Sequence, residues 1–314
     1  MSRTVTVGLD GSSESRAAAE WAAREARLRG LTLRLVNVWE PVPAPMAQAP
    51  LLGAETQQHW SERSEMGAPP AEGWGRIPRE AAEGLRLRHP GVEVVVEQLT
   101  GRPSEVLSDA AKESELLVLG SRGLSGIGGF LVGSVGQAVV AHAEGPVVLV
   151  RAGEAAADEH TMDPAGIPSA ATPYRPVVLG LDTASPDEAV IEFAIDAALR
   201  RATSLKVVHG FSLPPYFAYG LPDDPELNAT VSAEWASALT EVLRPWRQKF
   251  PSLEIVEHSR AGKAADQLVA VSLDASLVVV GRRIRRSPLG AHIGPVTHAV
   301  LHHATAPVAV VPHD

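Results

Sequence analysis

The chain contains two versions of the same sequence, one in each half. TVTVGLDGSS at 4–13 corresponds to PVVLGLDTAS at 176–185, and GPVVLVR at 145–151 corresponds to APVAVVP at 306–312. A longer string, GRPSEVLSDAAKESELLVLGSRG at 101–123, corresponds to GKAADQLVAVSLDASLVVVGRRI at 262–284. Repeats that keep their order over a whole half indicate duplicated structural units. Because 314 residues also correspond to about two domains of ordinary size, we expect two domains with one fold.

The segment between the repeats has the composition of a linker. It runs AGEAAADEHTMDPAGIPSAATPYRP, rich in Ala, Gly, Pro and acidic residues and without periodicity. We therefore expect a first domain at 1–152, a linker at 153–174 and a second domain at 175–314. The first half also carries extra residues between 41 and 100, and their Pro, Gly and Ala content predicts a long surface loop.

Short β-branched runs alternate with Ala-rich stretches in each half. In the first half we expect strands at 4–9, 32–39, 92–98, 116–120 and 147–151, with helices at 14–29, 77–89, 103–113 and 134–142. The fourth and fifth strands are apolar without alternation, which is typical of parallel strands buried on both faces. Right-handed crossovers then place helices on both faces of the sheet. The sequence predicts an α/β protein with two tandem, doubly wound, five-stranded parallel sheets.

Composition excludes several classes of function. The net charge of −9 argues against a general nucleic-acid binder, and the lack of cysteine excludes disulfide frameworks and thiol chemistry. No stretch reaches 18 apolar residues, and the N-terminus has no long apolar signal segment. We expect a cytoplasmic protein with no membrane partner. His298 and His302 stand four apart on a predicted helix, but nothing near them in sequence completes a metal site, so none is expected.

The chemistry-bearing residues follow strands one and four. In open α/β sheets, ligands bind beyond the carboxyl ends of the strands, where the strand order reverses. Asp10 follows the first strand, and after the fourth come Gly120-Ser121-Arg122-Gly123, nine residues, and Gly133-Ser134 opening a helix. Glycines allow close approach of a ligand, and the N–H groups of a helix N-terminus attract an anion. This pattern matches neither the P-loop nor a compact G-x-G-x-x-G fingerprint.

The pattern G-x2-G-x9-G-S, after the fourth strand of a unit that begins V-G-L-D-G-S, resembles the nucleotide-binding signature of the universal stress protein family. The resemblance covers both halves. It implies an adenine-nucleotide α-hydrolase-like fold with strand order 3-2-1-4-5 and domains that pair through strand five. It also implies ATP with Mg²⁺ as the ligand and a nucleotide-sensing role in stress response and survival. Regulatory protein partners, not identified by the sequence, and a homodimer of the tandem chain are further expectations.

The resemblance also assigns residues. It places Asp10 and Gly11 against adenosine and ribose, the backbone of Val38 against adenine, and Gly101 beside the nucleotide. The triphosphate cradle consists of Gly120, Arg122, Gly123, Gly133, Ser134 and Val135.

The second half departs from this pattern. Ile284 stands where the first half has Gly123, and Gly294-Pro295 replaces Gly133-Ser134. An isoleucine projects a side chain into the phosphate space, and proline has neither a backbone N–H nor a hydroxyl. We expect the first domain to bind nucleotide, and the second to be mainly structural or suited to another ligand.

Two other functions stay open at this point. One is an interaction module that binds no nucleotide, and the other is an enzyme of the same fold that adenylates a substrate. No catalytic residue is assigned, because no nucleophile stands beside an evident base, and ATP hydrolysis is expected to be slow at most.

Overall fold

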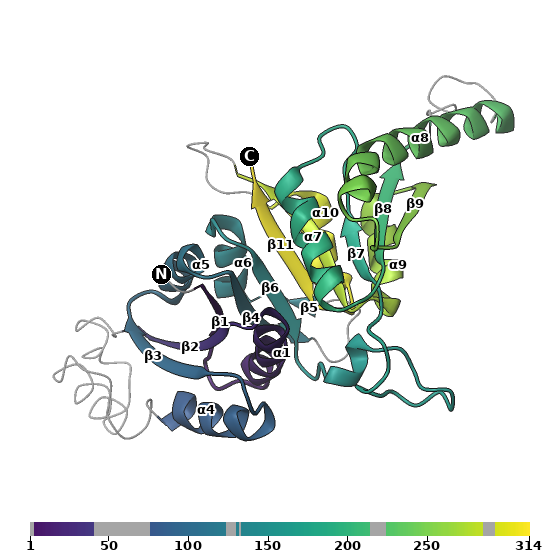
Figure 1. The fold of residues 1–314 in the computed structure, drawn as a ribbon. Coiled ribbons are helices and arrows are strands. Elements are labelled where there is room, and N and C mark those ends of the chain that lie inside the picture. Colours follow the sequence, from purple (N-terminus) through teal and green to yellow (C-terminus); the bar gives the residue numbers. More distant parts are fainter. Residues whose placement is uncertain (1–2, 41–75, 124–129, 132, 214–223, 285–292) are drawn as a thin grey trace. The chain divides into compact units, whose positions relative to one another are not determined.

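The computed structural model describes residues 3–40, 76–123, 130–131, 133–213, 224–284 and 293–314 (Figure 1). The long loop expected between strand two and the next helix falls largely at 41–75, outside the described residues. Most of the segment between Gly123 and Gly133 also lies outside them. By its contacts the chain divides into two compact units, one of 1–121 and 133–147 and one of 122–132 and 148–314.

The first half contains the strands and helices that the sequence predicts. They are β1 (Thr4–Gly8), α1 (Ser13–Arg29), β2 (Thr32–Trp39), α4 (Arg76–Arg88), β3 (Val94–Thr100), α5 (Pro103–Glu113), β4 (Leu116–Gly123), β5 (Phe130–Leu131), α6 (Ser134–His142) and β6 (Val147–Arg151). The third strand begins two residues later than predicted, because the Val92 N–H donates to the His89 carbonyl oxygen in the preceding turn.

The strand order of the first half is β3-β2-β1-β4, all parallel. Val5 of β1 lies opposite Leu33 of β2 and Leu116 of β4. The Leu117 N–H donates to the carbonyl oxygen of Pro146, directly before β6. The two-residue strand β5, which the sequence did not indicate, pairs antiparallel with the end of β4.

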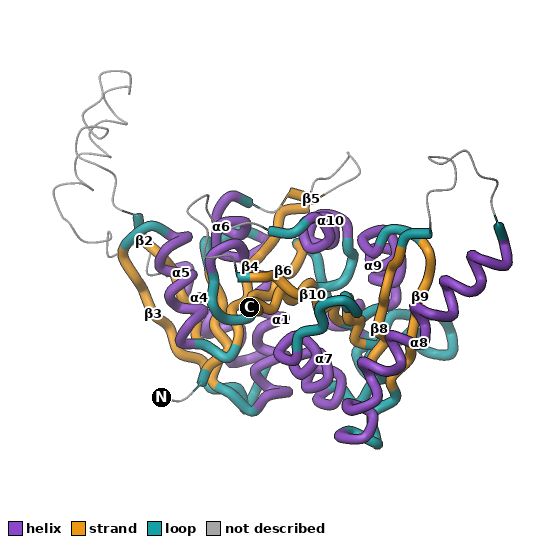
Figure 2. The backbone as a smooth tube through the Cα atoms, turned by 90° about the horizontal axis from the view of Figure 1, so that it is seen from above, coloured by secondary structure: helices purple, strands orange, loops and turns teal. Residues whose placement is uncertain are grey.

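The second half repeats this arrangement. Its elements are β7 (Val177–Gly180), α7 (Glu188–Arg200), β8 (Leu205–Phe211), α8 (Pro225–Lys249), β9 (Ile255–Ala261), α9 (Ala264–Val271), η3 (Ser272–Asp274), β10 (Leu277–Arg283), α10 (Pro295–His303) and β11 (Val308–His313). The strand order is β9-β8-β7-β10-β11, parallel throughout. This is the predicted order 3-2-1-4-5. The N-terminal turns of α8 extend beyond β8 and β9 (Figures 1 and 2).

The core follows from the apolar strands and the small residues of the helices. Val5, Val7, Leu117 and Val118 are fully buried, as expected for strands covered on both faces. Helix α1 packs an alanine-rich face on the sheet. It begins where the Ser12 side chain accepts a hydrogen bond from the Ser15 N–H, and it ends at Gly30, which has a positive φ of 64°.

The segment predicted as a linker is folded against the second half. It contains a short 3-10 helix, η1 (Ala156–Glu159), and Arg175 donates to the carbonyl oxygens of His160 and Leu273, both at 2.8 Å. Glu159 forms an ion pair with Arg201, with 3.7 Å between Oε2 and Nη2, and both side chains are almost fully buried. The domain boundaries given above stay a prediction. Within the described part of the chain, no helix has the length and apolarity needed to cross a membrane.

Candidate functional site

The carboxyl ends of β1 and β2 are joined by two hydrogen bonds. The Leu9 N–H donates to the Val36 carbonyl oxygen at 2.8 Å, and the buried side-chain amide of Asn37 donates to the Leu9 carbonyl oxygen at 2.7 Å. Asp10 is the next residue after Leu9, and Val38 the next after Asn37. Two of the sequence-predicted site residues therefore lie at one edge of the sheet.

Asp10 is held by the turn that leads into α1. Its Oδ1 accepts hydrogen bonds from the Ser12 N–H at 3.0 Å and from the Ser12 hydroxyl at 2.6 Å. Partial burial raises the pKa of the Asp10 carboxyl, but the hydrogen bonds from Ser12 and Ser15 outweigh it, and the pKa lies below its ordinary value. Asp10 is thus a fixed anionic acceptor at neutral pH.

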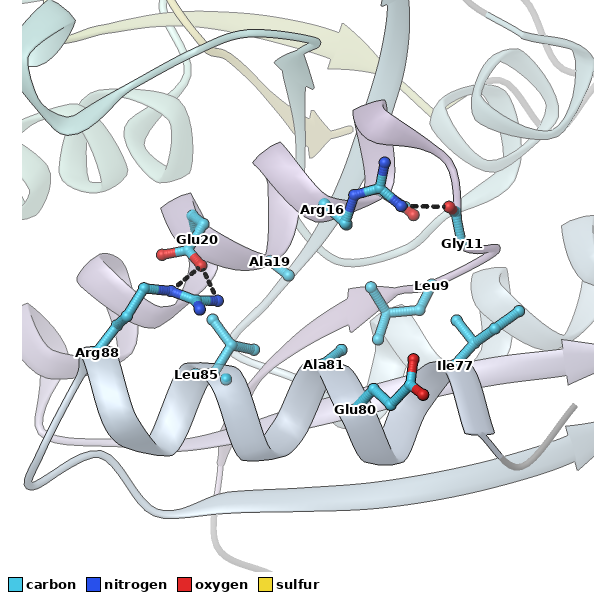
Figure 3. A pocket seen from close by; sticks show the side chains of 12 residues that line it. Leu9, Gly11, Arg16, Ala19, Glu20, Ile77, Glu80, Ala81, Leu85 and Arg88 are labelled. Carbon is cyan, nitrogen blue, oxygen red and sulfur yellow. Dashed lines mark hydrogen bonds and ion pairs between the residues drawn. The ribbon is translucent and has the colours of Figure 1, made fainter.

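Gly11 turns the chain from β1 into α1. Its φ of +86° is a conformation that side-chain-bearing residues rarely adopt. The Arg16 Nη1 donates to the Gly11 carbonyl oxygen at 2.7 Å, as Figure 3 shows, so the first turns of α1 hold this peptide in place. Gly11 also lines a cavity between α1 and α4, which sequence reasoning did not anticipate.

Helix α6 begins at Ser134, as the sequence predicted, and its N-cap is Gly133. No side chain caps its first turn, and that turn contains no acidic residue. Among the described α-helices with an assigned N-cap, only α6 and α10 lack both features. The Gln137 N–H is the first bonded within the helix, to the Gly133 carbonyl oxygen, which leaves the N–H groups before it without intrahelical partners.

The structure separates the predicted glycines by their surroundings. A Cβ at Gly120 would lie 2.5 Å from the backbone carbon of Glu14 and 2.7 Å from the Ser15 nitrogen, so α1 needs a glycine here for packing. Gly101 has a φ of +145°. Gly133 has an ordinary φ of −59°, and no described atom lies within 4 Å of a Cβ placed there.

Arg122 and Gly123 continue strand β4 rather than forming a loop. Arg122 pairs with Leu131 and Gly123 with Phe130. Arg122 and Gly123 belong to the second compact unit, whereas the other predicted site residues lie in the first. The structure describes the backbone course of Arg122 and Gly123 and nothing of the Arg122 side chain.

The second half has a pocket of about 480 Å³ at the carboxyl ends of β7, β8 and β10. Its polar lining residues are Asp182, Ser185, Asp187, His209, Arg283, Thr297 and His313. Asp182 is the counterpart of Asp10 in the repeat, but Ser185, Asp187, His209, Thr297 and His313 were not identified as site residues from the sequence. His209 could have been found from the sequence, because it corresponds in the repeat to Asn37, at the end of the second strand of the first half.

The charged groups of this pocket are partly engaged with one another. Arg283 donates to the Ser185 hydroxyl at 2.6 Å, and His313 Nδ1 lies 3.5 Å from a carboxylate oxygen of Asp187. Burial lowers the pKa of His209, although the neighbouring Asp182 opposes this shift. His209 is therefore a neutral imidazole at neutral pH.

Pro295 is the first residue of α10, where its fixed φ suits a helix but its missing N–H removes one donor. In the described chain, no group of three or more His, Cys, Asp or Glu side chains has the arrangement of a metal site.

Comparison with known proteins places this geometry in a family. The model of the universal stress protein family matches residues 1–151 and 173–312. A universal stress protein of Mycobacterium tuberculosis is 30% identical over 321 residues, covering 99% of this chain and 96% of that protein. A second one from the same organism is 31% identical, with 98% and 96% coverage.

A solved structure of a universal stress protein from Archaeoglobus fulgidus superimposes with a TM-score of 0.64 at 16% identity. It covers 99% of this chain and 98% of that one, so the similarity of fold extends over both halves. From the matching family model, the relatives of equal length and the shared fold, it follows that this chain belongs to the universal stress protein family.

Proposed function

We propose that the first half of the chain binds an adenine nucleotide, ATP with Mg²⁺, at the carboxyl ends of β1 and β2 and the N-terminus of α6. In this proposal the protein is a nucleotide-sensing regulator of stress response and survival. The observation that carries it is the N-terminus of α6, where no neighbour among the described residues crowds Gly133 and neither a capping side chain nor an acidic residue offsets the helix dipole. Such a terminus attracts phosphate through backbone N–H groups.

Asp10 supplies the complementary recognition of the nucleoside. Its carboxylate is ionised at neutral pH because hydrogen bonds hold its pKa low, and one of its oxygens already accepts from Ser12. A carboxylate at this edge of the sheet accepts hydrogen bonds from ribose hydroxyls. Mg²⁺ that arrives with a nucleotide keeps several waters and takes only one or two protein carboxylates, so a site with few acidic residues suits it.

The proposed role is binding rather than catalysis. A carboxylate with a lowered pKa is a weak general base, so Asp10 is poorly suited to activate water for attack on a phosphate. Any hydrolysis of ATP by this site is expected to be slow, and we assign no catalytic residue.

The two halves are proposed to differ in their ligands. Pro295 removes from α10 a backbone N–H that Ser134 provides in α6, and Ile284 stands where the first half has Gly123. We propose one ATP per chain, bound by the first half. The N-terminus of α10 is uncapped like that of α6, but it lacks the N–H and hydroxyl of Ser134, and Ile284 replaces the glycine, so the pocket of the second half is proposed not to hold a triphosphate.

Titration calorimetry with MgATP tests this function. The expected result is one site per chain, and Ser134→Pro is expected to weaken ATP at least tenfold because it removes an N–H and a hydroxyl. Glu188→Pro is the matched control, since Glu188 is the first residue of α7 and the Asp187 cap bonds to the two following N–H groups instead. Two equivalent sites, or unchanged affinity in Ser134→Pro, would refute the assignment.

A further inference from the structure

A cavity of about 310 Å³ lies between α1 and α4 in the first half (Figure 3). The apolar side chains that line it are Leu9, Ala19, Ile77, Ala81 and Leu85. Leu9, Ala19 and Leu85 are buried, and Figure 3 shows Leu9 and Leu85 between the two helices. The cavity is separate from the N-terminus of α6, because neither Gly133 nor Ser134 lines it.

The two halves can be compared residue by residue at this place. Arg86 donates to the Val94 carbonyl oxygen at 2.6 Å, and Arg247 donates to the Ile255 carbonyl oxygen at 2.8 Å. In both halves the acceptor lies eight residues after the arginine in the sequence. These two equivalent contacts show that Arg86 of α4 corresponds to Arg247 of α8, and this correspondence aligns the remaining residues of the two helices.

A second pair of contacts extends the comparison to α1 and α7. Glu20 of α1 bonds to Arg88 of α4, and Glu192 of α7 bonds to Lys249 of α8 at 2.9 Å. Lys249 corresponds to Arg88 in the register of α4 and α8, and Glu192 corresponds to Glu20 in the repeat. The pairs of helices are therefore equivalent.

The cavity lies where the first half has smaller side chains than the second. Ala19, Ala81, Gly84 and Leu85 of the first half correspond to Ile191, Val242, Pro245 and Trp246 of the second. Ile191 and Trp246 are buried, so the second half fills this space with its own side chains. Among the apolar lining residues, one position has the larger side chain in the first half, namely Ile77, which corresponds to Ala238.

The basic residues at the rim of the cavity are already engaged. Arg16 donates to the Gly11 carbonyl oxygen, and Arg88 Nε donates to Glu20 at 2.7 Å. The second carboxylate oxygen of Glu20 lies 2.8 Å from His89 Nε2. An anionic ligand would have to compete with these contacts or lie unpaired on an apolar floor, which is costly, and the Glu80 carboxylate that also lines the cavity would repel it.

The volume limits the size of the ligand. An engineered apolar cavity of about 150 Å³ holds benzene, and pockets for small molecules begin at about 300 Å³. This cavity is large enough for two fused rings and too small for a peptide.

We propose that the cavity between α1 and α4 binds a small, uncharged, mainly apolar molecule of about the size of two fused rings. The ligand lies against Leu9, Ala19 and Leu85. Gly11 borders both this cavity and the proposed nucleotide site, but the proposal does not require nucleotide binding, so either function can fail without the other.

Titration of the full-length chain with 5-fluoroindole, followed by ¹⁹F NMR, tests the proposal. The expected result is saturable binding at one site per chain. Ala19→Ile introduces the residue of the second half and is expected to weaken binding at least tenfold, with an unchanged or higher melting temperature. Ala81→Val, which also copies the second half, serves as a second variant if Ala19→Ile folds poorly.

Two controls make the test specific. Arg27→Ile places the same new side chain on the exposed face of α1 and is expected to leave the affinity unchanged. Indole-3-carboxylate, which carries a charge, is expected to bind at least tenfold more weakly than the neutral probe. The proposal is overturned by absence of saturable binding, by equal affinity in wild type and both filled variants, or by equally tight binding of the carboxylate.

Discussion

The side-chain amide of Asn37 donates a 2.7 Å hydrogen bond to the carbonyl oxygen of Leu9, joining β2 to β1 at the residue before Asp10. Asn37 is 1% exposed, and its Oδ1 has no hydrogen-bond partner among the described residues. The side-chain N–H of Asn37 therefore has an acceptor in the fold, whereas the buried Oδ1 of the same side chain receives no hydrogen bond from the described residues. A buried polar atom without a partner reduces stability, so the hydrogen bond to Leu9 is needed to offset the cost of burying the Asn37 side chain.

Asn37→Ala is expected to lower the free energy of unfolding by about 1–3 kcal/mol, because the Leu9 carbonyl oxygen loses its side-chain donor. Asn37→Asp is expected to be at least as destabilising at pH 7, since a carboxylate cannot donate. Urea denaturation measures both. An Asn37→Ala protein within about 0.5 kcal/mol of wild type, the range of neutral surface substitutions, would contradict the importance of this bond.

Gly120→Ala and Gly133→Ala form a matched pair of substitutions. They distinguish a glycine that is needed for packing from a glycine that is needed for the close approach of a ligand. At Gly120 the new methyl group would lie 2.5 Å from the Glu14 backbone, so we expect a loss of about 1–3 kcal/mol or more from overpacking. At Gly133 no described atom lies within 4 Å, so stability is expected to be unchanged while ATP affinity falls. Thermal denaturation with and without MgATP measures both effects. Equal loss of stability in the two variants would show that Gly133 also has a packing role.

The Asp10 carboxyl makes stability depend on pH. Its pKa is lower in the fold than the value near 3.9 of an unfolded chain, so its ionised form stabilises the protein above that value. This contribution disappears as pH falls through the pKa of the folded state. The stability difference between wild type and Asp10→Asn is expected to be larger at pH 7 than at pH 3. In a Ser12→Ala background the difference is expected to shrink, and a pH-independent difference would contradict the account.

Glu159→Gln is expected to destabilise the second half by about 3 kcal/mol or more, because it removes the buried carboxylate that pairs with the buried Arg201 guanidinium. The exposed pair of Asp196 and Arg200 is the matched control. Its atoms are 2.8 Å apart, but both side chains are over one-third exposed, so Asp196→Asn is expected to cost less than about 1 kcal/mol. Denaturation of the two variants makes the comparison. A neutral Glu159→Gln would mean that the segment before β7 adds little to the fold.

Much of the fold could be predicted because its signals are local and repeated. Apolar runs such as Leu116–Leu119 indicate buried parallel strands wherever they occur, and the second half reproduces the same series. The strand β5 could not be predicted, because a strand of two residues is too short to show periodicity. The contact of Glu159 with Arg201 was also hidden, since it joins residues far apart in a segment whose composition is that of a linker.

The sequence by itself determined the duplication, the class of fold and the positions of Asp10, Val38 and Ser134 at the ends of their elements, because each depends on order and spacing along the chain. Only the tertiary structure decided what the small residues do. Gly120 accommodates the backbone of α1, whereas Gly133 has no close neighbour in the described part of the chain and Ala19 borders a cavity. The physical reason is that a small side chain creates either a close contact or a void, and the distance to the neighbouring element selects between them.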